Sequence, residues 1–244
     1  MDTPLTMKIP APGIALLFTL AWGGCCSEAV AEELQPYTAN YSTSAMGLSL
    51  DVTRELTKSG ADYTLTSSGS SLLVKLSETS HFAVKDGRVL GKDYTYELKS
   101  VVRRRREVHF DPASGVIRAL RKDQWTEHPW SADILDTLSQ QEQLRLDLKA
   151  SAARGDPTPR TLEFTLVDGS RIKPEILDFV AVEELATPLG KVTTVRYHQR
   201  RESGAKRSSD IWVAPDLDYV MVLTRHREKD TDIEIKLQAL NLSP

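Results

Sequence analysis

The sequence has 244 residues, of which 31 are basic and 34 acidic, so the net charge is −3 at neutral pH. Hydrophobic residues make up 40% of the chain, which is enough to bury a sizeable core and argues against a disordered, collagen-like or polytopic membrane protein. The nearly balanced charge also argues against a nucleic-acid-binding protein, because such proteins are usually basic.

Residues 1–31 have the pattern of a secretory signal peptide. Lys8 precedes an uncharged stretch whose most apolar part is too short for a membrane span of about 20 residues. Small residues follow at Ala29 and Ala31, so we expect cleavage after Ala31. Anchoring as a lipoprotein at Cys25 is an alternative that the sequence before this cysteine fits less well. Both cysteines of the chain lie in this segment, so the mature chain has no thiol, disulfide or thiolate metal ligand.

Residues 32–244 are predicted to form a single antiparallel β domain. Apolar and polar residues alternate with a period of two over residues 37–45 and 48–56, which indicates strands with one buried and one wet face. Turn residues such as Asp86 and Gly87 separate further strand-like segments. Pro174 interrupts one of them, which is typical of a sheet edge or a bulge. The other predicted strands cover residues 93–99, 101–110, 116–120, 161–167, 172–185, 191–200, 208–213, 219–225 and 233–239.

One segment, residues 133–154, is predicted to be a helix. It has no proline or glycine, is rich in Leu, Gln, Glu and Lys, and is followed by Gly155 and Pro157. Ser131 or Asp133 is the expected cap of its first turn. Its leucines form a broad apolar stripe, although alternating leucines near its end also fit a strand. The fold class is therefore mainly β, a curved antiparallel sheet or open half-barrel with a mid-chain helix packed on its concave side.

Four consecutive arginines occupy residues 103–106 of a predicted strand. Arg103 and Arg105 face one side and Arg104 and Arg106 the other, so neither side is purely apolar core. Either the strand is an exposed edge, where charge prevents aggregation, or one face lines a wet cavity where guanidinium groups hold an anionic headgroup or phosphate. We favour the edge, and we keep Arg103 and Arg105 as candidate ligand-binding residues.

Aromatic and histidine side chains supply the remaining candidates. Trp125 and Trp130 lie just before the helix and are candidate residues of a pocket mouth, although a packed loop is the simpler interpretation. His109 and Asp111 share a face of a predicted strand and fit acid–base or metal chemistry, but an Asp is expected at the start of a turn in any case. The sequence contains no recognised catalytic, phosphate-binding or calcium-binding motif, so we predict no catalytic residue, metal or cofactor.

Several segments resemble a known family. They are Ala-Thr-Pro-Leu-Gly at 186–190, Ile-Trp-Val-Ala-Pro-Asp-Leu-Asp-Tyr at 211–219 and Glu-Lys-Asp at 228–230, together with Tyr37-x-x-x-Tyr41 and Asp-Thr-Leu-Ser at 136–139. Together they resemble the bacterial exported family catalogued as domain of unknown function 3108. The resemblance spans nearly the whole mature chain. It implies a periplasmic protein of a Gram-negative bacterium, and it carries no catalytic residues, because the family has none assigned.

These observations predict an exported periplasmic protein that binds or assembles envelope material rather than an enzyme. A cavity between the sheet and the covering helix suits an apolar or amphiphilic ligand such as a lipid. Two alternatives stay open. One is a periplasmic hydrolase acting on envelope material through His109 and Asp111 or the loop between Trp125 and Trp130. The other is a structural partner of another envelope protein, which pairs through an exposed strand edge.

Overall fold

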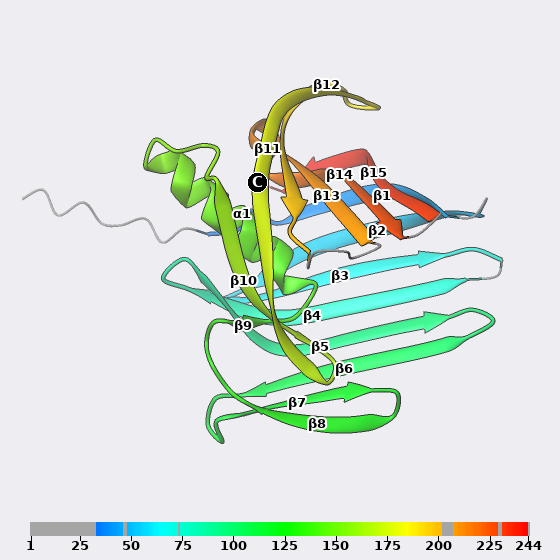
Figure 1. Ribbon diagram of the computed structural model, residues 1–244, viewed down its shortest axis with the longest axis vertical. Coiled ribbons are helices and arrows are strands. Elements are labelled where there is room, and N and C mark those ends of the chain that lie inside the picture. The colour runs from blue at the N-terminus through cyan, green and yellow to red at the C-terminus, as the bar shows by residue number, and fades with distance from the viewer. Residues whose placement is uncertain (1–32, 46–47, 73, 202–206, 229–230, 244) are drawn as a thin grey trace, which may run out of the picture. The chain divides into compact units, whose positions relative to one another are not determined.

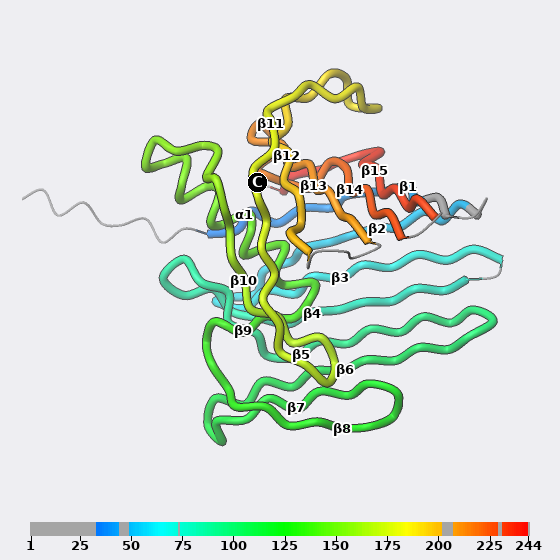
Figure 2. Tube along the Cα trace, in the orientation of Figure 1, coloured from blue at the N-terminus to red at the C-terminus, as the bar shows by residue number. Residues whose placement is uncertain are grey.

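Strands dominate the computed structural model, which describes residues 33–45, 48–72, 74–201, 207–228 and 231–243 (Figures 1 and 2). The strands are β1 (Tyr37–Ala45), β2 (Leu48–Ser59), β3 (Asp62–Ser70), β4 (Lys75–Lys85), β5 (Arg88–Lys99), β6 (Arg103–Asp111), β7 (Val116–Arg121), β8 (Gln124–Pro129), β9 (Ile134–Leu135), β10 (Thr161–Asp168), β11 (Arg171–Thr187), β12 (Gly190–Gln199), β13 (Arg207–Ala214), β14 (Val220–Glu228) and β15 (Thr231–Leu242). Helix α1 (Ser139–Ala153) lies between β9 and β10, and the short 3-10 helix η1 (Pro215–Leu217) follows β13. None of the described helices is both long and apolar enough to cross a membrane.

All the strands belong to one sheet, in the order β8-β7-β6-β5-β4-β3-β2-β1-β15-β14-β13-β12-β11-β10-β9. Neighbouring strands in this order pair antiparallel, except that β9 runs parallel to β10. The pairing of β1 with β15 places Tyr37 opposite Leu242, so the two ends of the described chain meet in the middle of the sheet. The order does not return from β8 to β9, so the sheet stays open. The predicted mainly antiparallel, open architecture is confirmed.

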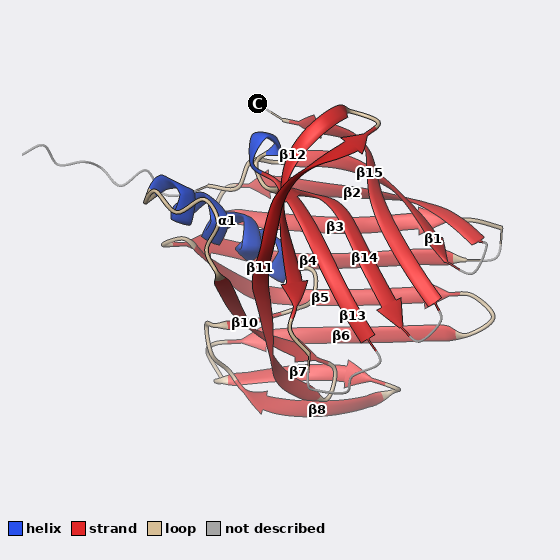
Figure 3. Ribbon diagram, turned by 45° about the horizontal axis from the view of Figure 1, so that its top comes forward, coloured by secondary structure: helices blue, strands red, loops and turns tan. Residues whose placement is uncertain are grey.

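The core lies inside the curve of this sheet, where strands β3–β8 form one wall and β11–β14 pass across it (Figure 3). Alternate residues of each strand face the inside, because side chains of a strand point to opposite faces in turn. On β1 these are Tyr37, Ala39 and Tyr41, all of which are buried. Buried side chains from both walls and from α1 form one continuous hydrophobic cluster.

Helix α1 lies inside the curve, but the prediction that it begins near residue 133 was wrong. Residues Ile134–Leu135 instead form β9, which pairs with Thr165 and Leu166 of β10. The helix begins at Ser139. The segment ahead of it is therefore used to extend the sheet rather than the helix.

Asp136 gives the physical reason for the late start of the helix. Its fully buried carboxylate accepts the backbone N–H groups of Leu138 at 2.8 Å and Ser139 at 2.9 Å. It also accepts the hydroxyl of Ser80 on β4 at 2.7 Å. These bonds satisfy donors that have no partner within the helix, which is the role expected of a cap. Asp136 therefore replaces the predicted caps, Ser131 or Asp133.

Strand β11 runs continuously through Pro174. The first pair that joins β11 to β12 is Leu177 with Gln199, so Pro174 lies at a local free edge, as predicted. The register shift on this strand lies further along, between Phe179 and Ala181, rather than at the proline.

Candidate functional site

A cavity of about 310 Å³ lies between the first turns of α1 and the inner faces of β1, β2 and β11–β15. One part of its lining is apolar or aromatic, and includes Tyr37, Leu144, Ile211, Val213, Met221 and Ile235. The other part is polar or charged, and includes Arg54, Gln140, Lys173, Glu175, Gln199 and Arg201. Ligand pockets usually have such a lining, in which apolar walls carry a few convergent polar groups.

Arg54 and Gln140 line this cavity, and each has a buried donor that no described residue accepts. Arg54 is only 7% exposed; its Nη1 donates to Oε1 of Gln141, and its guanidinium lies 5.2 Å from the centre of the Tyr41 ring. Among the described residues, Nε of Arg54 has no hydrogen-bond partner. Gln140 is 4% exposed, and its Nε2 likewise has no partner. A buried donor without an acceptor costs about 1–3 kcal/mol, so these two groups are poised for an acceptor from a ligand.

The electrostatics of the cavity favour an anion. Lys173 and Arg201 both line it, and Lys173 lies 3.0 Å from Asp168. Burial raises the pKa of Glu175, although Lys173 and Arg201 oppose this shift. Four cationic side chains line the cavity, those of Arg54, Arg145, Lys173 and Arg201, against the two acidic side chains of Glu142 and Glu175. The result is an excess of positive charge around the cavity.

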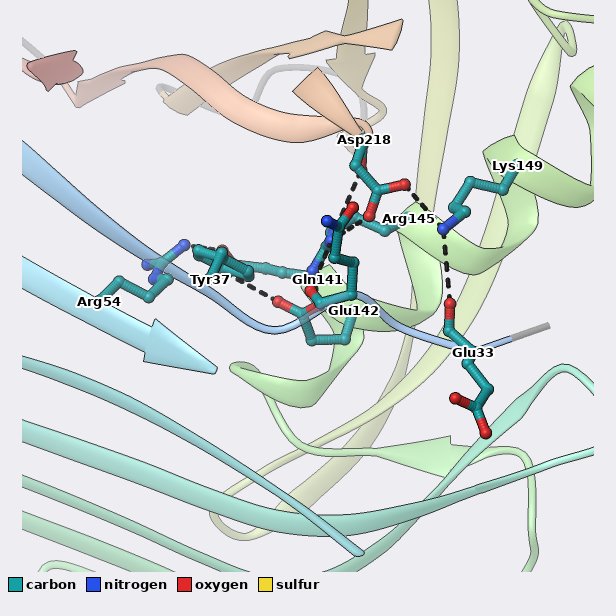
Figure 4. A network of polar contacts seen from close by, with 9 residues as sticks. Glu33, Tyr37, Arg54, Gln141, Glu142, Arg145, Lys149 and Asp218 are labelled. Carbon is teal, nitrogen blue, oxygen red and sulfur yellow. Dashed lines mark hydrogen bonds and ion pairs between the residues drawn. The ribbon is translucent and has the colours of Figure 1, made fainter. Parts of the chain in front are cut away.

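A buried polar network beside the cavity fixes the position of α1 (Figure 4). Nη1 of Arg145 lies 2.5 Å from Glu142, and its Nη2 pairs with Asp218. The hydroxyl of Tyr37 donates to Glu142 at 2.9 Å, and Nζ of Lys149 lies 2.7 Å from Asp218. The network therefore ties α1 to β1 on one side and to the turn after η1 on the other.

That turn is part of the segment that carries the family resemblance. Asp218 and Tyr219 have φ angles of 54° and 57°, in the left-handed region that non-glycine residues rarely adopt. The turn presents the carboxylate of Asp218 to α1, so its role is to hold the helix. Tyr219 packs in the core, whereas Trp212 is buried on the other face, between Arg196 and Arg225.

The four arginines lie on β6, between β5 and β7, so the strand as a whole is not the sheet edge that we favoured. Pairing with β7 begins only at Arg106, opposite Arg121, and residues 103–105 therefore have a free edge on that side. Arg104 and Arg106 share a face with the buried Val108 and so point inward.

Arg103 and Arg105 point to the outer face of the sheet. Arg103 donates to Glu97 at 2.7 Å, and Arg105 pairs with Glu107. Both arginines line a basic cleft of about 700 Å³ at the end of β6 and β7. They are therefore separate from the cavity beside α1.

The two tryptophans are not brought together in one pocket. Trp125 is on the outer face, where its ring stacks on His109 at 5.5 Å and lies under Arg118 at 5.1 Å. Trp130 packs against the core at the end of β8. None of the four candidate ligand-binding residues, Arg103, Arg105, Trp125 and Trp130, lines the cavity beside α1.

The structure does not form the pair of His109 with Asp111. Nδ1 of His109 lies 2.7 Å from Asp93 on β5. Asp111 instead accepts the backbone N–H groups of Ala113 and Ser114, as an aspartate at a turn does. Within the described residues, no three His, Cys, Asp or Glu side chains are grouped so that they could hold a metal ion.

The sequence does contain a signal for Arg54, although this residue is not among the predicted site residues. Val52, Arg54 and Leu56 lie on the same face of β2, so an arginine occupies the apolar phase of an alternating strand. A charged residue in that phase predicts either a buried pair or a polar cavity. Gln140 offers no comparable signal, because glutamine is ordinary on any face of a helix.

Comparison with known proteins places the chain in a family. Residues 37–238 match the model of the family described as protein of unknown function (DUF3108). No curated protein matches the chain. A β-barrel-like protein of domain of unknown function DUF1849 from Brucella abortus has a similar structure, with a TM-score of 0.56 and 13% identity over 86% of this chain and 99% of that one. At this identity the likeness shows the fold alone.

A second solved structure, described as a "putative lipoprotein" from Parabacteroides distasonis ATCC 8503, matches over 85% of this chain and 96% of that one. Its TM-score of 0.32 and 8% identity are too low to support an inference. The assignment to a family rests on the family match, because this match covers most of the chain and includes the strands and the helix that build the cavity. The chain therefore belongs to the DUF3108 family of proteins of unknown function.

Proposed function

We propose that this protein is a non-enzymatic binding protein that holds an amphiphile with an anionic head group in the cavity beside α1. The observation that carries the proposal is the pair of unused, buried donors, Nε of Arg54 and Nε2 of Gln140, on residues of a cavity that also has apolar walls.

The polar and apolar parts of the lining match the two parts of such a ligand. The head group accepts hydrogen bonds from Arg54 and Gln140, and Lys173 adds positive charge nearby. The tail lies against apolar side chains such as Ile211 and Met221. The cavity volume is at the lower end of the range of about 300–1,000 Å³ typical of ligand pockets, which suits a ligand with a single short chain.

Export is a separate part of the proposal. Residues 1–32 lie outside the described residues, so support comes from the charge and hydropathy pattern of this segment. We propose cleavage after Ala31 and release into the periplasm. Mass spectrometry of the protein from its native host tests this: an N-terminus at Glu32 supports it, whereas a diacylated Cys25 would show anchoring as a lipoprotein instead.

The binding proposal is tested by calorimetric titration with decyl sulfate, a single-chain amphiphile whose charge does not change with pH. We expect saturable binding that is at least about tenfold tighter than that of decyl maltoside or decyltrimethylammonium, because only the sulfate accepts hydrogen bonds as an anion.

Substitution of Arg54 provides the decisive comparison. Arg54→Met is expected to weaken decyl sulfate binding by about tenfold or more, since one charge-assisted hydrogen bond is lost. Arg118→Met is the matched control, because Arg118 lies on the outer face and does not line the cavity. The proposal fails if folded Arg54→Met protein binds decyl sulfate as tightly as the unsubstituted protein, or if the three amphiphiles bind equally.

A further inference from the structure

Three turns gather at one end of the strands of the wall formed by β3–β8 (Figures 1 and 3). They join β3 to β4, β5 to β6 and β7 to β8. We call this end the turn rim, and define it by Leu72, Val101, Val102, Lys122 and the adjoining basic residues of β4–β7. The sheet order places the strands that carry these turns side by side.

Apolar side chains project from the tips of two of these turns. Leu72 is 99% exposed, Val101 is 100% exposed and Val102 is 58% exposed. Single exposed apolar residues are ordinary. Here three of them lie at the tips of two neighbouring turns, and none of the three belongs to the hydrophobic core. They are separate tips rather than a flat continuous patch, which suits insertion into a fluid surface better than contact with a rigid protein.

Basic side chains surround these tips. Lys75 lies opposite Lys99 on the next strand, and Lys99 lies opposite Arg103. Like charges placed directly across a sheet repel each other, so an anionic surface next to them would relieve this repulsion. Glu97 is the acidic side chain that offsets them, at 3.1 Å from Lys99 and 2.7 Å from Arg103.

The cleft at the end of β6 and β7 extends this positive charge. Arg104, Arg121 and Lys122 line it, and none of the three has an ion pair with another described residue. Asp123 is its one acidic lining residue. Since the whole chain has a net charge of −3, this concentration of cations is a local feature of the turn rim.

From this arrangement we infer that the turn rim docks on an anionic lipid bilayer. Leu72, Val101 and Val102 enter the interface between head groups and acyl chains, while the surrounding lysines and arginines contact lipid phosphates. Apolar contact combined with electrostatic attraction to anionic lipid is the usual basis of reversible surface binding. The inference does not depend on the proposed ligand of the cavity, because neither Arg54 nor Gln140 belongs to the turn rim.

Vesicle flotation tests this inference with the purified protein. Vesicles of phosphatidylcholine with about 30% phosphatidylglycerol should bind the protein at least about tenfold more strongly than vesicles of pure phosphatidylcholine, and added salt should weaken the binding. Absence of binding to the anionic vesicles, or equal binding to both kinds, would overturn the inference.

Two sets of substitutions separate the apolar and the charged contributions. Leu72→Ser with Val101→Ser, and Lys99→Gln with Lys122→Gln, are each expected to weaken vesicle binding by about tenfold. The matched control is Leu189→Ser with Lys191→Gln, which changes one exposed apolar and one exposed basic residue at the turn between β11 and β12.

All these side chains are exposed, so circular dichroism should be unchanged in every variant. If the turn-rim variants bind anionic vesicles like the unsubstituted protein, the inference is wrong. Decyl sulfate binding distinguishes the two proposals. Variants of the turn rim should keep it, whereas Arg54→Met should lose it and still bind vesicles.

Discussion

Two arginines around the cavity are both buried, Arg145 on α1 and Arg54 on β2, but their surroundings differ. Arg145 is 3% exposed and lies 4.8 Å from the centre of the Tyr37 ring, and Arg54 is 7% exposed and lies 5.2 Å from that of Tyr41. Arg145 pairs with two carboxylates and also donates to the backbone carbonyl groups of Asp218 and Gln35. Within the part of the chain that the structure describes, Arg54 donates to one amide oxygen, and its Nε has no acceptor.

The difference separates a structural role from a binding role. A buried charge is tolerated when its hydrogen bonds are satisfied, and Arg145 meets that condition within the chain. Arg54, on β2, does not, because its Nε has no hydrogen-bond partner among the described residues. The proposed ligand would supply the acceptor that Arg54 lacks within the described residues.

The largest expected effect comes from breaking the satisfied network. Arg145→Met leaves Glu142 buried without its cation and removes one of the two cations that pair with Asp218, so we expect the free energy of unfolding to fall by about 3–5 kcal/mol. Urea denaturation followed by circular dichroism measures this change.

A matched substitution controls for the loss of any arginine. Arg227 pairs with Asp232 at the surface, so Arg227→Met should leave the denaturation midpoint unchanged. Equal destabilisation by the two substitutions would contradict a structural role for the network around Arg145.

A smaller effect on stability is expected at Arg54. Arg54→Met removes a buried charge that forms no ion pair with a described residue, although Glu78 and Glu142 act on it from further away, and replaces it with an apolar side chain of similar length. We therefore expect the free energy of unfolding to change by about 1 kcal/mol or less, in contrast to Arg145→Met. A loss as large as that for Arg145→Met would mean that Arg54 serves the fold rather than a ligand.

The smallest expected effect is a pH dependence of anion binding. Burial raises the pKa of Glu175, and the other charged groups around it are Lys173, Arg201 and Asp168. A raised pKa means that Glu175 takes up a proton as the pH falls toward the ordinary value of about 4.3. The cavity then becomes more positive, so decyl sulfate should bind more tightly as the pH falls below neutral.

Glu175→Gln isolates this contribution. The variant should bind decyl sulfate about threefold more tightly than the unsubstituted protein at neutral pH, because one negative charge is lost. Its affinity should also depend less on pH. Parallel pH profiles for the two proteins would show that Glu175 is not the group that responds.

Much of the fold could be predicted from the sequence, because alternation and turn residues are local signals. The strand pairs joined by short turns, such as the one at Asp86 and Gly87, are examples. The start of α1 could not be predicted in this way. It depends on Asp136 meeting Ser80, which lies 56 residues earlier in the chain, and no local pattern reports such a contact.

The candidate site was less predictable than the fold. Runs of charge drew attention to Arg103 and Arg105, which lie on the outer face, whereas the cavity depends on isolated polar residues. Arg54 was detectable as a break in apolar alternation, but its unpaired Nε results from the positions of β1 and α1 around it. Whether a buried polar group is satisfied is a property of the tertiary structure.

The pairing of β1 with β15 makes the chain suitable for circular permutation. Ser243 donates its N–H to the carbonyl of Pro36 at 2.9 Å, so the start of β1 and the end of β15 are neighbours. Joining these ends and opening the chain between β8 and β9 gives a circular permutant in which every strand pairs with the next one along the sequence. Folding slows as contacts become more distant in sequence, so the permutant should reach the same structure faster than the natural order does.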